Sequence, residues 1–337
     1  MKKSLLIIFF FYLFACCGWA KKVASFPGLF RVDHFNIDDH QLYITQGFNI
    51  YIYSRKDYKL LKKFGKRGDG PREFNGFVHV APYKDYLVIT SSGKISFFNK
   101  QGEFQREIKS VSSKNGIFLP LGEGFVGRGY DLAKKNLLYR TINLYDGRFK
   151  KGSEIFRYTD QFRKKAGKRK YNLMEDRNRR FRVINNKILV GHPNGSITVF
   201  DKKGSRMTTI KRTYEKIPFK EIHKKELIDT FLLTNPGKKG TYKQWKNMLE
   251  FPTHFPPIQL FQTSDEKVFV LTHKRVSQKA ECFVYDLEGK LLKQTMASII
   301  DLSPKEPYPL AFFKGKIYQV YEKEDTETWQ LQVIKIL

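Results

Sequence analysis

The sequence predicts an all-β fold: a six-bladed β-propeller of four-stranded antiparallel blades, with a helical insertion before blade five. Two observations lead to this prediction. A unit of β-rich runs joined by a polar turn recurs along the 337 residues, and its turns begin at Ser54, Asn99, Asp146 and Asp201. These positions are 45, 47 and 55 residues apart, close to the length of one blade. Aromatic residues also make up 15% of the chain, and they favour strands over helices.

The N-terminus predicts a leader that takes the chain out of the cytoplasm. Lys2 and Lys3 precede the apolar run Leu5–Phe14, which is too short for an ordinary membrane span. The small residues Gly18 and Ala20 suit a signal peptidase, so residues 1–20 are predicted to be a signal peptide and residues 21–337 the propeller. The mature protein would then be periplasmic or secreted.

A second exit from the leader competes with the first. The residues Leu13-Phe14-Ala15-Cys16 resemble a bacterial lipoprotein box, although Phe14 fits that pattern poorly. In this alternative the leader ends at residue 15, and a lipid on Cys16 anchors the protein to a membrane.

The repeat is clearest in the second strand of each unit, which is followed by a third strand and then by the turn. These second strands are predicted at Gln41–Thr45, Tyr86–Thr90, Gly124–Gly127, Lys187–Val190, Lys267–Leu271 and Lys316–Val320. The sixth unit lacks its outermost strand, and the N-terminal run Leu29–Val32 is expected to supply it and close the ring. A seventh blade would require a degenerate copy after Arg212.

The segment 214–257 interrupts the repeat. Glu221–Leu233 spaces its apolar residues at a helical period, and Tyr242–Phe251 is interpreted as a second helix. Asn235-Pro236-Gly237 separates the two. We therefore expect a helical insertion that packs on the propeller.

The linker Phe64–Phe74, Phe-Gly-Lys-Arg-Gly-Asp-Gly-Pro-Arg-Glu-Phe, joins the first unit to the second. Its three glycines tolerate positive φ, and its proline fixes φ, so we expect a shaped turn with both phenylalanines buried. The glycines do not indicate a nucleotide site, because a strand and not a helix follows them.

This linker resembles the Phe-Gly-x-x-Gly-x-Gly-Pro-Gly-Glu-Phe signature of a family of exported bacterial six-bladed β-propeller proteins. Phe251–Ile258 is similar to a second stretch of that family, Phe-Pro-x-x-x-Pro-Pro-Ile, at the end of a helical insertion. The resemblance implies the fold and export, and it brings no reaction and no catalytic residues. Arg72 stands where the family has glycine, so the turn there is either reshaped or does not need positive φ.

Candidate binding residues follow from the registration of the repeats. The connections between blades share a face with the loops that follow each second strand, and that face receives the linker, the basic stretch Arg157–Arg182 and the insertion. A rigid scaffold with elaborated loops on one face is a common basis for binding. The candidates are Gln46, Arg67, Arg72, Ser91, Arg128, His192, His273 and Tyr321.

Charge and site chemistry favour a binding protein. The formal net charge of +29 attracts anions. We expect a non-enzymatic binding or scaffold module of the bacterial cell envelope, with a protein, a peptide, an acidic glycan or an anionic surface as partner. Sequence-specific nucleic-acid binding is not expected, and a membrane is reached only through the Cys16 anchor.

The alternative is a hydrolase or lyase acting on a small anionic substrate in the central funnel. The predicted funnel positions contain no carboxylate, which disfavours this chemistry. His192 and His273 occupy equivalent places in their blades and could converge on a metal or an anion, but no third ligand is in register. No catalytic residue, metal ligand or cofactor is predicted, and Cys282 is expected to be a buried, inert thiol.

Overall fold

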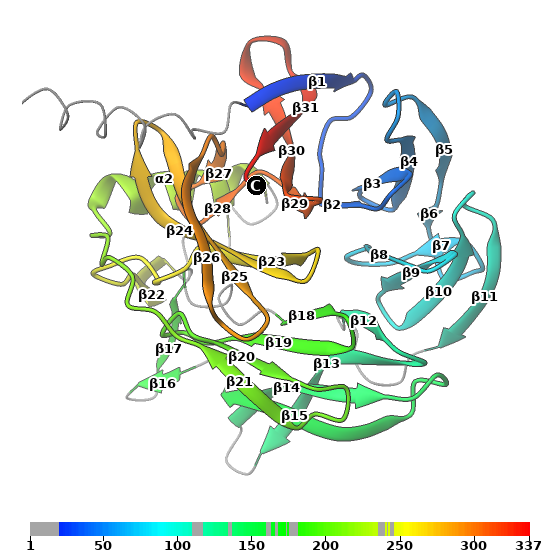
Figure 1. Ribbon diagram of the computed structural model, residues 1–337, viewed down its shortest axis with the longest axis horizontal. Helices are drawn as coiled ribbons and strands as arrows, with labels where there is room; N and C mark the ends of the chain where they lie inside the picture. Colours follow the sequence, from blue (N-terminus) through cyan, green and yellow to red (C-terminus); the bar gives the residue numbers. More distant parts are fainter. Residues whose placement is uncertain are drawn as a thin grey trace, which may run out of the picture.

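The structure, a computed structural model, describes residues 20–109, 117–133, 137–159, 163–165, 168–172, 174, 181–234, 240, 242 and 246–337. It confirms the six-bladed propeller: six four-stranded antiparallel sheets stand in a ring (Figure 1). The innermost strands of neighbouring blades contact one another all the way around, so the ring is closed.

The first three blades follow the chain from the inside to the outside of the ring. Blade 1 is β2 (His34–Ile37), β3 (Gln41–Gln46), β4 (Asn49–Ser54) and β5 (Leu60–Phe64). Blade 2 is β8 (His79–Tyr83), β9 (Tyr86–Ser91), β10 (Lys94–Asn99) and β11 (Phe104–Lys109). Blade 3 is β12 (Phe118–Leu121), β13 (Gly124–Ala133), β14 (Leu137–Tyr145) and β15 (Lys151–Thr159).

The remaining blades repeat this order until the last. Blade 4 is β18 (Phe181–Ile184), β19 (Lys187–Gly191), β20 (Ile197–Phe200) and β21 (Arg206–Ile210). Blade 5 is β23 (Leu260–Ser264), β24 (Lys267–Val276), β25 (Lys279–Asp286) and β26 (Leu291–Ala297). Blade 6 is β29 (Leu310–Phe313), β30 (Lys316–Lys323), β31 (Thr328–Lys335) and β1 (Ala20–Phe26).

The N-terminal chain closes the ring, as expected, but with a different strand. β1 pairs antiparallel with β31, from Ala20 opposite Ile334 to Phe26 opposite Trp329. The prediction of Leu29–Val32 as the closing strand was wrong. Leu29 and Val32 are buried in the core between blades 6 and 1. The backbone N–H groups of the residues between them are taken by a side chain, because Gln46 Oε1 accepts from both.

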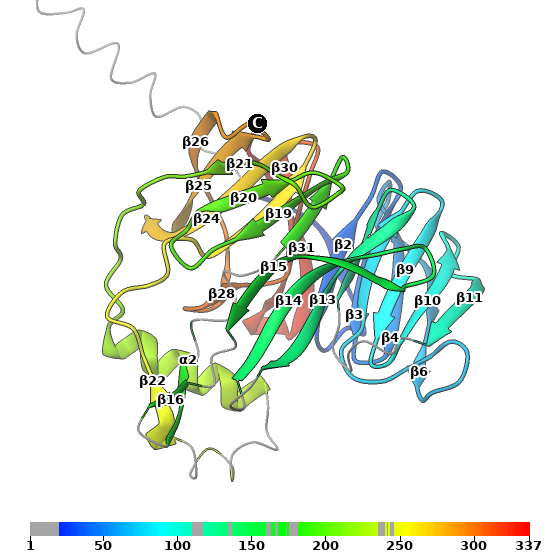
Figure 2. The same ribbon diagram turned by 90° about the horizontal axis from the view of Figure 1, so that it is seen from below.

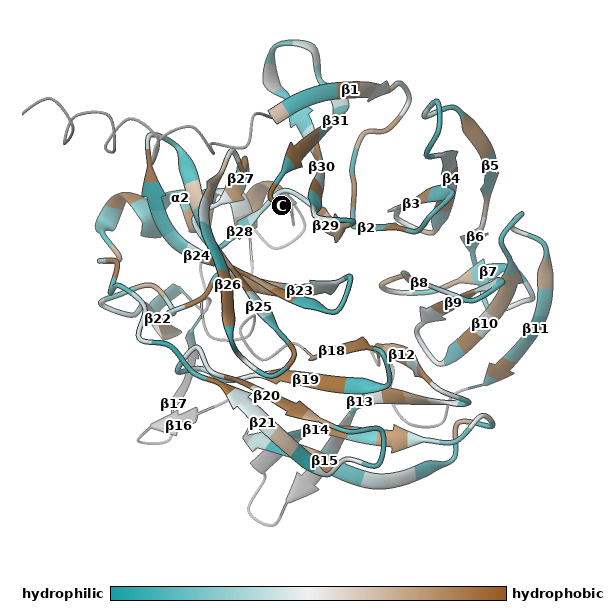
Figure 3. Cartoon of the chain, in the orientation of Figure 1, coloured by the Kyte–Doolittle hydropathy of each residue, from teal (hydrophilic) through white to brown (hydrophobic). Residues whose placement is uncertain are grey.

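The core lies between the blades. Each described hydrophobic cluster combines residues of neighbouring sheets. Aromatic rings also pack between neighbouring blades: the ring centres of Phe64 and Phe98 are 4.8 Å apart, and those of Phe269 and Phe312 are 4.6 Å apart. Figure 3 shows the hydrophobic residues running along the strands and the hydrophilic ones at the turns. This layout is why the second strands of the blades, such as β3, β9 and β19, are buried on both faces.

The turns between third and fourth strands explain the repeat seen in the sequence. The Oδ1 of Asn99, Asp146, Asp201 and Asp286 accepts backbone N–H groups two and four residues later. In three of these turns the residue three positions on is a glycine with positive φ, and in the turn of Asp146 that place is taken by Phe149 at φ 61°. Side-chain acceptors of this kind stabilise the turn locally.

In the insertion, the helix α2 (Glu221–Thr234) confirms the first predicted helix. The second, predicted over Tyr242–Phe251, is wrong in its described C-terminal part: η4 (Lys246–Met248) is a 3₁₀ turn and β22 (Leu249–Glu250) a strand. β22 is strand-like because it pairs in parallel with β17 (Lys168–Asn172), which in turn pairs with β16 (Arg163–Lys165). The basic stretch of the sequence and the insertion therefore form one small sheet.

The linker between blades 1 and 2 is a rigid turn. β6 (Lys66–Arg67) and β7 (Glu73–Phe74) pair in parallel, and the Glu73 carboxylate accepts the N–H of Gly70 at 2.9 Å. A Cβ at Gly65, whose φ is +95°, would lie 2.4 Å from the carbonyl oxygen of Phe48. Phe74 is fully buried and Phe64 partly so, which bears out their role as anchors.

The backbone at Arg72 contradicts one of the two alternatives left open by the sequence, the one in which no positive φ is needed there. The turn keeps a positive φ of 65° there, with an arginine in place of glycine. The connection between blades 5 and 6 also differs from the blade pattern, because β27 (Asp301–Ser303) and β28 (Glu306–Pro307) form a small hairpin there.

Replacing Arg72 by glycine is expected to raise the free energy of unfolding by up to about 1 kcal/mol, because glycine adopts positive φ without the steric cost that other residues carry. Urea unfolding measures the change. Arg67→Gly is the matched control: Arg67 lies in β6 without positive φ, so glycine there should lower stability. A loss of stability in Arg72→Gly would contradict the strain.

Candidate functional site

The two faces of the ring differ. The loop-rich face carries the loops between second and third strands and the connections from blade to blade; the hairpin face carries the other turns. Figure 2 shows α2, β16, β22 and β6 at the same end of the molecule. This confirms that the linker, the basic stretch and the insertion belong to one face.

Ion pairs join neighbouring blades on the hairpin face. Asp38 accepts from Lys100 of blade 2, and Asp39 of blade 1 pairs with Lys314 of blade 6. Glu288 of blade 5 lies 3.4 Å from Lys187 of blade 4. These three ion pairs therefore hold neighbouring blades together.

The linker presents two arginines on the loop-rich face. Arg67 and Arg72 are both exposed, and no ion pair between described residues involves either of them. The guanidinium of Arg67 lies 5.9 Å from the ring centre of Phe48, while the neighbouring Lys66 is paired with Glu73 at 3.1 Å. The turn therefore presents to solvent two positive charges that have no ion-pair partner within the part of the chain that the structure describes.

Two of the predicted binding residues, Gln46 and Tyr321, make hydrogen bonds within the fold, and the buried Ser91 hydroxyl has no hydrogen-bond partner among the described residues. Gln46 is buried, accepts the N–H groups of Phe30 and Arg31, and donates to the Tyr51 hydroxyl at 3.2 Å. Ser91 is buried at the end of β9, and the Tyr321 hydroxyl donates to Gln330 at 3.1 Å. Burial raises the pKa of the Tyr321 phenol.

Arg128 lies in the second strand of blade 3, and two histidines lie at the innermost strands of blades 1 and 2. Arg128 is half-buried in β13, and its N–H donates to Ile117 at 3.1 Å. His34 and His79 begin the innermost strands of blades 1 and 2, and their ring centres are 4.2 Å apart. The sequence did not predict this pair, although both histidines occupy the first position of an innermost strand.

His273 does not face a funnel. Its ring stacks on Phe255 of the insertion at 4.4 Å and hydrogen-bonds the backbone carbonyl of Pro304, which joins the insertion to the loop between blades 5 and 6. Burial, with the nearby charge of Arg275, lowers the pKa of His273 to about 3. His273 is therefore a neutral residue that packs between the insertion and the loop between blades 5 and 6, and its ring contact is with Phe255 and not with His192.

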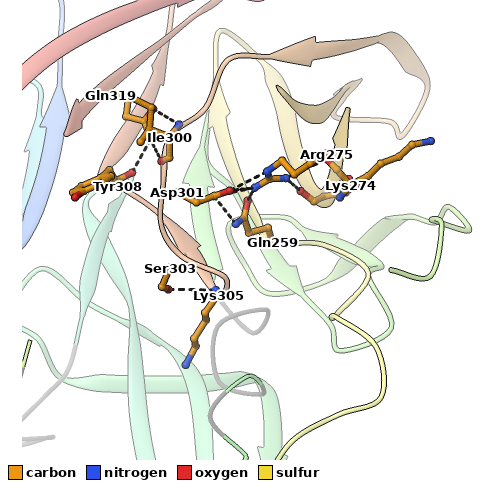
Figure 4. Close-up of polar contacts among 10 residues, drawn as sticks. Gln259, Lys274, Arg275, Ile300, Asp301, Ser303, Lys305, Tyr308 and Gln319 are labelled. Carbon is orange, nitrogen blue, oxygen red and sulfur yellow. Dashed lines mark hydrogen bonds and ion pairs between the residues drawn. The ribbon is translucent and has the colours of Figure 1, made fainter. Parts of the chain in front are cut away.

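The same joint contains a polar network, shown in Figure 4. Arg275 Nε and Nη2 both donate to the Asp301 carboxylate at 2.9 Å, and Gln259 Nε2 donates to Asp301 at 3.0 Å. Arg275 also donates to the backbone carbonyl of Thr272 at 2.7 Å. Because every group in this network already has a protein partner, it supports the loop-rich face and offers little to a ligand.

His192 lines a pocket on blade 4. The pocket has a volume of about 470 Å³ and is lined by His192, Pro193, Asn194, Ser196, Thr198, Arg206, Thr209 and Lys211. The His192 ring lies edge-on to Phe156 of β15, with 5.0 Å between centres, so blade 3 flanks the site. Burial and the charge of Arg206 lower the pKa of His192.

The insertion fixes the hairpin that carries His192. Gly195, at φ +82°, lies so close to the two ends of the insertion that a Cβ there would be 2.7 Å from Pro257 and 3.3 Å from Tyr214. The Gly195 N–H donates to the His192 carbonyl at 3.0 Å. The pocket is therefore built on a supported turn.

Other chemistry is limited in the part of the chain that the structure describes. No group of three or more His, Cys, Asp or Glu side chains there could hold a metal ion. No described helix is long and apolar enough to cross a membrane. Cys282 is buried, and burial raises the pKa of its thiol to about 12, as expected of an unreactive cysteine.

No family model and no curated protein matches the chain. Among solved structures, it is similar to BamB from Moraxella catarrhalis, with 10% identity, a TM-score of 0.43 and coverage of 93% of this chain and 99% of that one. The computationally designed protein Ika8 gives 10% identity, a TM-score of 0.41 and coverage of 94% and 100%. BBS1N in complex with ARL6DN gives 11% identity, a TM-score of 0.38 and coverage of 94% of this chain and 81% of that one.

Proposed function

We propose that this protein is a non-enzymatic binding module that recognises an acidic partner, a protein, peptide or glycan, at its loop-rich face. The observation that carries the proposal is the linker. Its backbone is held by Glu73 and by close packing at Gly65, and it presents Arg67 and Arg72 to solvent without a carboxylate partner among the described residues.

The strained backbone at Arg72 supports this function. A glycine would adopt the same φ without cost, yet the turn carries a long cationic side chain. Backbone strain that persists is often associated with a functional requirement at that position. Positive charges on a preorganised surface speed and orient the encounter with an acidic partner.

Charge reversal of the linker tests the proposal. Arg67→Glu/Arg72→Glu is expected to weaken binding to immobilised polyglutamate and to dextran sulfate by about tenfold, because exposed ion pairs contribute up to about 1 kcal/mol each. Biolayer interferometry at physiological salt measures the change, and high salt should abolish the difference.

The control is Arg148→Glu/Lys150→Glu on the hairpin face. These residues are exposed, and the double variant changes the net charge by the same amount. If both variants lose affinity equally, attraction to the whole basic molecule explains binding and the linker has no special part in it.

A further inference from the structure

The pocket beside His192 has a lining suited to a negatively charged group. Three basic side chains, His192, Arg206 and Lys211, and three hydroxyls, Ser196, Thr198 and Thr209, surround it, and the lining contains no carboxylate. Guanidinium and ammonium groups only donate hydrogen bonds, and hydroxyls can donate as well. A ligand here must supply acceptors and negative charge.

A chain of hydrogen bonds links Arg206 to His192 across the pocket. Arg206 Nη2 donates to Thr209 Oγ1 at 2.8 Å, and Thr209 Oγ1 lies 3.4 Å from Thr198 Oγ1. Thr198 Oγ1 lies 2.7 Å from His192 Nε2. When His192 Nε2 carries no proton, Thr198 donates to it, and when Nε2 is protonated, it donates to Thr198, so the protonation state of His192 sets the direction of this chain. Burial and the charge of Arg206 lower the pKa of His192, so a negative charge placed beside the imidazole favours its protonation.

We propose that this pocket binds a terminal oxyanion, a phosphate or sulfate group, between Arg206, Lys211 and the hydroxyl of Thr198, while the Ser196 hydroxyl donates to Asn194 Oδ1 at 2.7 Å. Ser196 and Thr198 are nearly buried, while Arg206 and Lys211 are exposed and have no ion pair among the described residues. The pocket is open to solvent, so a molecule that carries the oxyanion can extend out of it. The site shares no residue with the linker, and it stands or falls separately from the proposed function.

His192 couples the site to pH. The charged groups that share the pocket with it are Arg206 and Lys211, and β15 contributes the uncharged ring of Phe156. A bound oxyanion favours the imidazolium, whose Nε2–H then donates to Thr198 and reverses the chain. Because burial lowers the pKa of free His192 from its ordinary value and the anion raises it, affinity should increase as pH falls.

Titration with inorganic phosphate, inorganic sulfate and glycerol phosphate tests the site, with calorimetry for affinity and the His192 ring resonances as a local readout. Vesicles of phosphatidylcholine with and without phosphatidic acid separate a lipid headgroup from a free phosphate. The wild-type protein should bind at least one of these probes, with the His192 resonances shifting toward the imidazolium. Arg206→Gln/Lys211→Gln should weaken that binding by tenfold or more.

Lys202→Gln/Lys203→Gln, on the hairpin face of the same blade, is the matched control and should stay within twofold of wild type. Thr198→Val removes a hydroxyl at constant charge and should also weaken binding. Absence of binding to every probe at low salt, or equal losses in the Arg206/Lys211 and control variants, would overturn the proposal. Circular dichroism shows whether either double variant has a folding defect. If one of them does, the effect of Thr198→Val on binding decides the test in its place.

Discussion

Replacing Lys94 by methionine is expected to lower the free energy of unfolding by about 3 kcal/mol, since breaking a buried ion pair leaves its partner uncompensated. Lys94 is only 5% exposed. Its Nζ lies 3.0 Å from Glu107 and donates to the carbonyl oxygen of Gly70 at 2.7 Å. One ammonium therefore joins the outer strand of blade 2 to the linker, and the variant loses both connections. Urea unfolding with intrinsic fluorescence measures the change.

Two further variants isolate the cause. Lys109→Met, an exposed residue opposite Lys94 on β11, should change stability by less than about 0.5 kcal/mol. Lys94→Met/Glu107→Gln removes the stranded carboxylate and should recover part of the loss. A cost below about 1 kcal/mol for Lys94→Met would mean that the linker is held by its own packing, without the ammonium.

The repeat made most of the fold predictable because the same turn chemistry recurs. In blades 2, 4 and 5, an Asp or Asn acceptor followed three residues later by glycine marks the turn between the third and fourth strands. The apolar second and third strands precede this turn in each blade. Helix α2 was predictable for a related reason: its apolar spacing differs from that of every strand around it.

The errors in the fold arose where partners lie far away in sequence. β1 begins Ala20-Lys21-Lys22, directly after a leader-like run, and its strand character comes from pairing with β31 at the other end of the chain. β22 is a strand only because β17 lies beside it. The sequence around Lys94 gives no sign that it is buried, because its burial depends on the linker, which packs over it and accepts from its ammonium group at Gly70.

The candidate site was predictable in part. Registration of the repeats identified the strand ends of the loop-rich face, but it could not give the direction of each side chain. Gln46 and His273 point into the protein, whereas His192 points into a pocket. Arg206 and Lys211 were missed because they belong to an outer strand and its end, where basic residues usually face solvent.

Replacing Phe26 by alanine should have the second large effect, because this residue fastens the ring. It is 1% exposed on the closing strand, opposite Trp329 of blade 6, and its ring lies 4.6 Å from Tyr53 of blade 1. Truncation of a buried phenylalanine typically costs about 3–5 kcal/mol through lost burial and the cavity left behind. We therefore expect a loss of about 3–4 kcal/mol in urea unfolding.

The loss should also have a structural consequence that distinguishes ring closure from ordinary core packing. If β1 detaches, β31 becomes an exposed strand edge, and such edges pair between molecules. Phe26→Ala should then raise hydrogen exchange in β31 and β1 together and promote oligomers in light scattering, while Ser25→Ala, exposed on the same strand, should do neither. Exchange that stays slow in β31 despite the lost stability would show that the backbone ladder, and not the Phe26 side chain, keeps the ring closed.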